Sequence, residues 1–241
     1  EARGRRDASC HFQATLAGGL LLAGATLLLS GAALATSLLG LALAGLAIGS
    51  RSDRPPLAFH GVAYLAAAAS AAGLAGSAAD ALLASAIGPW RELTGSGGAV
   101  LLVAAVGYGL LLAGPRSPDA HWWRRLPHAL VAVLLGCGLL GAAARWLVLA
   151  LGAGPGPHAD AAVVATVRTA LLALLAVALA WAGRRFKLLE LSWLVYPVLA
   201  CGGLKLLFED LPRGRPATLF LSLTLYGGAL VATPRLLRRE R

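Results

Sequence analysis

The sequence predicts an all-α membrane protein, a polytopic transmembrane bundle of about eight spans that forms a single domain over residues 1–241. Three observations support this prediction. The segment from Phe12 to Ser50 has no charged side chain, several further apolar segments follow it, and 58% of all residues are hydrophobic while only 13% are charged. Soluble domains carry about 25% charged residues. Because lipid offers no hydrogen bonds to the backbone, long Leu/Ala/Gly segments of this length are expected to be membrane-spanning helices.

The first apolar segment is too long for one span. A single helix over residues 12–50 would measure about 58 Å at 1.5 Å per residue, against a hydrocarbon core of about 30 Å. A turn near Ser30 and Gly31 would divide it into two short spans, 12–30 and 33–50.

The distribution of basic residues favours this division. With a hairpin, 15 Lys and Arg fall on one side of the membrane and 3 on the other, whereas a single first span gives 12 and 6. Basic loops stay in the cytoplasm. We therefore predict eight spans with a cytoplasmic C-terminus, and keep seven spans as the alternative.

Pro, Gly and Arg residues separate the later apolar segments at 51–56, 115–127, 152–158 and 209–216. The remaining spans are expected at 57–79, 98–114, 128–152, 161–182, 188–208 and 217–233. Trp residues lie near several predicted span ends, as in the aromatic belts of membrane proteins; these are Trp90, Trp122, Trp123 and Trp146.

The composition limits the class of protein further. The loops are too short for a soluble domain, and the net charge of +10 comes from basic loops, which indicates contact with lipid headgroups rather than with nucleic acid. Abundant Ala, Leu, Gly and Arg indicate a GC-rich bacterial genome and hence the bacterial inner membrane. Since the chain has no Met, we expect the numbered sequence to begin downstream of the start codon.

Charged residues inside spans are costly, and they are the first candidates for a functional site. Arg145, Arg168 and Lys205 fall within predicted spans, and acidic residues lie towards the same, non-cytoplasmic surface. Asp80 is the first expected partner of Arg168, and Glu209 follows Lys205 at the i, i+4 spacing that favours pairing on one helix face. These side chains would form a polar cluster in the non-cytoplasmic half, together with Asp210. The alternative is purely structural, with snorkelling of Arg145 and Lys205 and an ion pair at Arg168.

No motif for catalysis or metal binding is evident in the sequence. His60 and His128 lie at similar depth in two different spans, which would permit one bis-histidine haem site, but histidines near helix ends are more often interfacial residues. Cys137 and Cys201 lie within spans without redox or metal spacing and are expected to pack as small apolar residues. We therefore predict no cofactor apart from bound lipids.

Small residues recur at spacings that allow helices to approach closely. Gly45 and Gly49 form a GxxxG pattern, and Gly136, Gly138 and Gly141 share one predicted helix.

The C-terminal segment 203–235 contains Lys205, then an apolar stretch, Asp210-Leu211, and a Ser- and Gly-containing span with a basic end. This pattern resembles the C-terminal end of a class of very long bacterial multi-spanning proteins that share a domain of unknown function. The resemblance implies membrane-spanning helices and carries no function.

Three functions remain open from the sequence. The first is a non-catalytic accessory or scaffold subunit of a larger membrane complex, because chemical motifs are lacking and small-residue helix faces are frequent. The second is a transporter of a small molecule, an ion or a lipid that uses the polar cluster around Arg168. The third is a b-type haem electron carrier with His60 and His128 as ligands.

Overall fold

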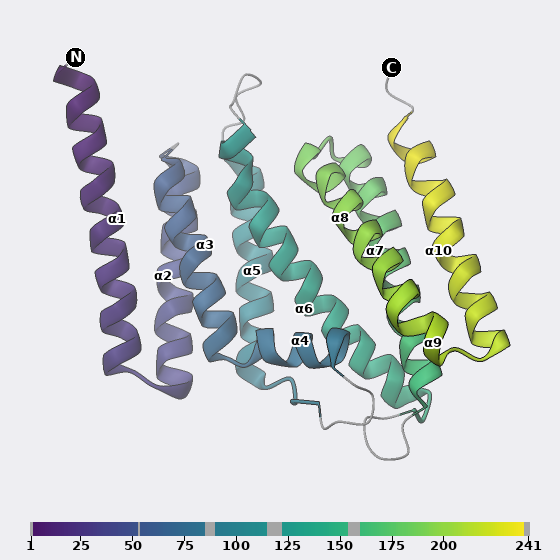
Figure 1. The fold of residues 1–241 in the computed structure, drawn as a ribbon. Coiled ribbons are helices and arrows are strands. Elements are labelled where there is room, and N and C mark those ends of the chain that lie inside the picture. The colour runs from purple at the N-terminus through teal and green to yellow at the C-terminus, as the bar shows by residue number, and fades with distance from the viewer. Residues whose placement is uncertain (1, 53, 85–89, 115–121, 154–159, 239–241) are drawn as a thin grey trace. The chain divides into compact units, whose positions relative to one another are not determined.

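The computed structural model describes residues 2–52, 54–84, 90–114, 122–153 and 160–238; for residues 2–12 and 14 it describes the backbone alone. The described residues form helices and turns and contain no strand, so the predicted all-α class is confirmed. Contacts divide the chain into two compact units (Figure 1). Unit 1 comprises residues 1–75 and 93–135, and unit 2 comprises residues 76–92 and 136–241. The prediction of a single domain stays a prediction.

The first apolar segment is broken where the sequence predicts a turn. Helix α1 covers Ala2–Leu28 and α2 covers Gly31–Arg51. Ser30 is extended, with φ −138° and ψ 160°, and Gly31 has φ +56°, a conformation that favours glycine. This backbone reversal stops α1 and starts α2, so residues 12–50 form two helices.

Helices α2 and α3 (Pro55–Ala71) make the most extensive contact of unit 1. A Cβ atom added at Gly49 would lie 2.6 Å from the backbone nitrogen of Ala58, and one added at Gly45 would lie 2.9 Å from the Cα of Gly61. The two backbones therefore touch where the GxxxG pattern predicts a close approach.

The predicted span 57–79 is not one straight helix. Gly73 takes φ +74°, and α4 (Leu74–Leu83) leaves α3 at an angle of 71°. The chain changes direction at this left-handed glycine, and the number of apolar residues in the segment does not reveal the change. The predicted span 57–79 is therefore a bent pair of helices, which together are long and apolar enough for a membrane span.

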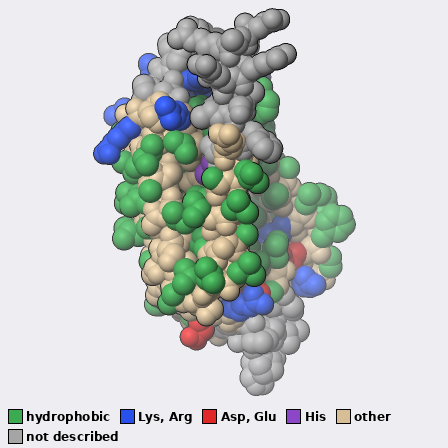
Figure 2. Space-filling view, turned by 90° about the vertical axis from the view of Figure 1, so that its left-hand side faces the viewer, with side chains coloured by type: hydrophobic (Ala, Val, Ile, Leu, Met, Phe, Trp, Pro, Cys, Tyr) green, Lys and Arg blue, Asp and Glu red, His purple; other side chains and the backbone are tan. Residues whose placement is uncertain are grey.

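The remaining helices of unit 1 are α5 (Gly95–Ala113), the short 3₁₀ helix Trp122–Arg125, and the first part of α6 (Leu126–Ala150). The Thr94 hydroxyl accepts a hydrogen bond from the backbone N–H of Gly97 and caps α5. Figure 2 shows hydrophobic and neutral side chains over the middle of the visible face, with basic side chains gathered near its ends.

Unit 2 is built around α7 (Ala161–Arg185), which packs against α8 (Leu189–Lys205) on one side and α10 (Pro216–Leu237) on the other. A π-helical turn, η2 (Leu206–Asp210), and the short α9 (Leu211–Arg213) follow α8. Asp160 caps α7 by accepting from the N–H groups of Ala162 and Val163. The same carboxylate lies 3.1 Å from the guanidinium of Arg215, directly before α10.

Six helices among the described residues are long and apolar enough to cross a membrane, and the bent pair α3 and α4 would make a seventh. The apolar part of α1, Thr15–Leu28, is shorter than these. The chain is thus a multi-pass helical membrane protein by length and composition, while the predicted eighth span depends on α1.

The Trp residues predicted near span ends differ in exposure. Trp122, Trp123 and Trp146 are exposed, as a position at the membrane surface requires, whereas Trp90 is buried in unit 2. Cys137 and Cys201 also lie on exposed helix faces rather than packed inside.

Candidate functional site: a buried polar cluster in unit 2

The centre of the polar cluster is Arg168, whose side chain is 1% exposed. It projects from the part of α7 that is buried between its neighbours, where Thr166 and Thr169 are also buried. A buried guanidinium needs both a counter-charge and hydrogen-bond acceptors. Unit 2 supplies both.

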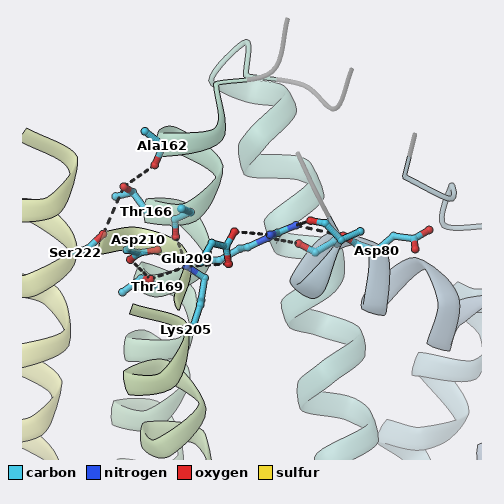
Figure 3. A network of polar contacts seen from close by, with 12 residues as sticks. Asp80, Ala162, Thr166, Thr169, Lys205, Glu209, Asp210 and Ser222 are labelled. Carbon is cyan, nitrogen blue, oxygen red and sulfur yellow. Dashed lines mark hydrogen bonds and ion pairs between the residues drawn. The ribbon is translucent and has the colours of Figure 1, made fainter. Parts of the chain in front are cut away.

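The counter-charge of Arg168 is Glu209. The Arg168 Nη1 atom donates to the Glu209 Oε1 atom at 2.8 Å (Figure 3). The predicted partner, the Asp80 carboxylate, instead accepts from the backbone N–H of Arg91 at 2.9 Å and lies 3.8 Å from the Arg91 guanidinium. The prediction of an Arg168–Asp80 carboxylate pair is therefore wrong, although Asp80 does contact Arg168 through its backbone.

Arg168 also caps the C-terminal end of α4. Its Nε donates to the carbonyl of Ala81 at 2.7 Å, and its Nη2 donates to the carbonyls of Ala84 at 2.7 Å and of Asp80 at 3.3 Å. The last four carbonyls of a helix have no partner within that helix, and the negative end of its dipole favours a cation. One side chain thus joins the bent segment to α7.

The indole of Trp90 covers the guanidinium of Arg168, with 5.3 Å between the guanidinium carbon and the ring centroid. The aromatic face attracts the cation and keeps water away from it. This contact explains why Trp90 is buried rather than placed in an aromatic belt.

A second ion pair lies one helical turn away on α8 and η2. The Lys205 ammonium donates to the Asp210 carboxylate at 2.6 Å, to the Thr169 hydroxyl at 3.0 Å, and to the carbonyl of Ala165 at 2.7 Å. The Thr169 hydroxyl donates to the other Asp210 oxygen at 2.6 Å. Lys205 therefore does not snorkel to the surface. It points inward and satisfies all three of its donors.

Glu209 connects the two pairs, because its second oxygen lies 3.5 Å from the Lys205 ammonium. The predicted i, i+4 contact between Lys205 and Glu209 is confirmed. The Lys205–Asp210 contact needs the π-helical turn. An α-helix separates residues five apart by about 140°, whereas the i to i+5 bond from the Leu211 N–H to the Leu206 carbonyl brings them to one face.

Arg145 belongs to the edge of this site. Its guanidinium donates to the carbonyls of Trp90 at 3.3 Å and Arg91 at 3.1 Å, and it lies 3.6 Å from the exposed Glu92 carboxylate. The structure thus connects all six polar candidates from the sequence to one region of unit 2. It adds Trp90, Thr169, Thr166 and Ser222, of which the last two hydroxyls lie 3.5 Å apart.

The histidine pair lies in unit 1 and is not arranged as a haem site by any contact described. The ring of His60 packs against Gly18 of α1, while the Nε2 atom of His128 lies 3.1 Å from the carbonyl of Leu111. Among the described residues, no group of three or more His, Cys, Asp or Glu side chains is placed to hold a metal ion.

The fold and the site define a multi-pass helical membrane protein whose buried charges pair with one another. Comparisons with known protein families, with curated proteins and with solved structures gave no match to the chain.

Proposed function

We propose that this chain is a non-catalytic integral membrane subunit that anchors or scaffolds a larger membrane complex. The observation that supports this proposal best is the closure of the polar cluster. Arg168 makes one bond to Glu209 and three to the backbone of the bent segment, and Lys205 has three acceptors of its own. Charges that are paired within the chain stabilise helix packing, and few of their hydrogen-bonding groups remain available to a substrate.

Open helix faces support the same proposal. Small residues that would allow another helix to approach have no neighbour within 4 Å of an added Cβ atom on several helices; these are Gly19, Gly24, Gly40, Gly98, Gly109, Gly227 and Gly228. In lipid, such faces favour helix–helix association because close backbone contact replaces looser lipid contact.

The test is purification of the tagged chain from native membranes in mild detergent, with mass spectrometry of the proteins that elute at constant stoichiometry. We expect one or more integral membrane proteins at fixed ratio, and we expect their complex to fall apart on a native gel when the chain is deleted. Elution of the chain alone, or as a homo-oligomer, would contradict the proposal.

A specific observation favours transport as a second candidate. Polar contacts run from the exposed Arg91 to Asp80, whose carbonyl meets Arg168, and from Arg168 through Glu209 and Lys205 to the buried Asp210. They include the end of α4 and the π-helical turn, and interrupted helices line the sites of many transporters.

The transport candidate is tested in liposomes that contain the purified protein and a pH-sensitive dye. An imposed gradient of protons, and in parallel of Na⁺ or K⁺, should collapse faster with the wild-type chain than with Lys205→Met/Asp210→Leu, which removes the inner ion pair and retains side-chain bulk. Equal rates for empty liposomes, wild type and variant would exclude ion transport by this cluster.

For the topology, we propose eight spans in a bacterial inner membrane with a cytoplasmic C-terminus. The helix break at Ser30 and Gly31 supports the hairpin on which the eighth span depends. The basic ends of the helices support the orientation.

A further inference from the structure

We propose that one end of unit 2 binds the phosphate headgroup of an anionic phospholipid. This surface, here called the basic end, lies where α7 and α10 finish and α8 begins. It consists of Arg184, Arg185, Lys187, Arg235 and Arg238.

The two ends of unit 2 differ in how their charges are paired. At the opposite end, Arg91, Arg145 and Arg215 each have a carboxylate within 4 Å, and among the described residues Arg213 is the one cation there without such a partner. Within the described part of the chain, none of the five cations of the basic end has such a partner. Such an excess of positive charge attracts anions from outside the chain.

The basic residues of α7 and α10 lie at the same level. Both helices start together, at the Asp160–Arg215 contact of 3.1 Å, and remain in step at the Thr166–Ser222 contact of 3.5 Å. The two helices therefore run parallel, and the same offset along the chain puts Arg238 at about the level of Ala182 and Gly183, directly before Arg184 in the sequence. Cations from two helices thus face one layer of the bilayer.

The α7–α8 turn holds its basic side chains outward. The backbone N–H of Leu188 donates to the Gly183 carbonyl at 2.8 Å and that of Lys187 to the Arg184 carbonyl, which closes the end of α7. Lys187 takes φ +55° at the position where such helix ends usually carry glycine. At this position a lysine, in place of the usual glycine, puts an ammonium group at the tip of the turn.

The start of α8 adds backbone donors to this end. Its N-cap residue, Leu188, offers no side-chain cap to the first N–H groups, and a helix N-terminus attracts anions. Glu190 is the one acidic side chain described here; it lies in the first turn, where the helix dipole also favours it, and it is buried. The exposed charge of the basic end is therefore positive throughout.

Aromatic side chains beside the cations indicate a lipid rather than a free phosphate. The Arg185 guanidinium lies over the Phe186 ring at 6.0 Å, and Phe186 meets Trp181 edge to face at 6.1 Å. Both rings are more than half exposed, with 56% for Phe186 and 54% for Trp181. Exposed aromatic rings beside or one turn from a group of cations are typical of the boundary between headgroups and acyl chains.

The test measures lipid retention by native mass spectrometry of the full chain in detergent, with phosphatidylglycerol, phosphatidylcholine or inorganic phosphate added at increasing concentration. The test variant is Arg184→Gln/Arg185→Gln/Lys187→Gln. The matched control is Arg91→Gln/Arg213→Gln/Arg215→Gln, which removes the same charge from the opposite end. Circular dichroism checks that each variant keeps its helix content.

We expect the wild type and the control to retain phosphatidylglycerol in preference to phosphatidylcholine, and the test variant to bind it at least tenfold more weakly. If the test variant does not fold, Arg235→Gln/Arg238→Gln on α10 replaces it, with weaker retention again expected. Equal retention of the two lipids, or equal losses in test and control variants, would overturn the proposal. Binding of inorganic phosphate as tightly as phosphatidylglycerol would also overturn it, because the basic end would then be a site for a free anion.

Discussion

Arg168 has two roles in unit 2, as the partner of Glu209 and as the cap of α4. Arg168→Ala should remove both. It leaves three carbonyls of the bent segment without this donor, and it leaves the partly buried Glu209 carboxylate with the Lys205 ammonium at 3.5 Å. We expect a loss of about 3–5 kcal/mol, the usual cost of breaking a buried ion pair. Thermal unfolding in detergent measures this loss.

Two further variants separate charge from geometry at this position. Arg168→Lys keeps the charge but has no planar fork to reach several acceptors, so it should recover only part of the stability. Arg213→Gln changes an exposed arginine that has no ion pair within the described part of the chain, and it should alter the stability by less than about 0.5 kcal/mol. Full stability in Arg168→Lys would show that the contacts to α4 are of little importance.

The Thr169 hydroxyl donates to Asp210 and accepts from Lys205, and it is fully buried. Thr169→Val keeps the shape and removes both hydrogen bonds, so it should cost about 1–3 kcal/mol. Thr224→Val is the control, because the Thr224 hydroxyl bonds only to its own helix at the carbonyl of Phe220 and is exposed. Equal unfolding temperatures for the two variants would contradict the role assigned to Thr169.

At the residue scale, the sequence reveals which side chains are costly in lipid but not which atoms they meet. Arg168, Lys205, Glu209 and Asp210 stand out because charges are rare in spans. Trp90 and the α4 carbonyls do not stand out in the sequence. Their contact with Arg168 depends on a bend that the pattern of apolar residues does not reveal. Thr169 could have been suggested by its position beside Arg168 on a helix with few polar residues.

Helix packing in unit 1 depends on glycines that differ in their surroundings. A Cβ at Gly49 would lie 2.6 Å from the backbone of Ala58, whereas one at Gly40, on the same helix α2, meets nothing within 4 Å. Gly49→Ala should force the α2 and α3 backbones apart and cost about 1–3 kcal/mol. Gly40→Ala should leave stability unchanged or raise it by up to about 1 kcal/mol, because alanine favours the helix. Unfolding in detergent compares the two, and a stabilising Gly49→Ala would refute the close contact.

The π-helical turn η2 and the Lys205–Asp210 pair should stabilise each other. Lys205→Met leaves Asp210 as a buried carboxylate without its cation and should cost about 3–5 kcal/mol. Adding Asp210→Leu removes the stranded charge, so the double variant should recover most of the loss. A double-mutant cycle by thermal unfolding measures the coupling; additive effects would show that the pair does not hold the turn.

At the element scale, sequence patterns locate most helices but not their interruptions. The break at Ser30 follows from length alone, because a helix of the full segment could not match the bilayer. The bend after α3 depends on one left-handed glycine among many glycines in the chain. The π-helical turn has no recognisable residue pattern, since the Lys205–Asp210 contact within it joins residues five apart, a spacing that an α-helix does not bring to one face.

At the scale of the whole molecule, charge is sorted along the helices. Among the described residues of unit 2, five basic side chains without an ion pair gather at one end, whereas at the other end Arg91, Arg145 and Arg215 are paired and Arg213 is not. The sequence predicts this asymmetry because the positive-inside rule concerns the Lys and Arg residues of loops and does not depend on how the helices between them pack. It does not predict the pairing, which depends on tertiary contacts.

The proposed eight-span topology can be tested with single cysteines in a chain whose own three cysteines are replaced by serine. A maleimide that does not cross membranes is added to intact cells. Ser30→Cys, between α1 and α2, and Arg213→Cys should react, because a hairpin places both outside. Arg54→Cys and Lys187→Cys should react only after the membrane is opened, since their basic surroundings retain them in the cytoplasm.

If Arg213→Cys reacts from outside and Ser30→Cys does not, α1 does not cross the membrane as a separate span and the seven-span alternative stands. Reaction of Lys187→Cys in intact cells would instead reverse the orientation, and it would place the basic end of unit 2 against the outer leaflet.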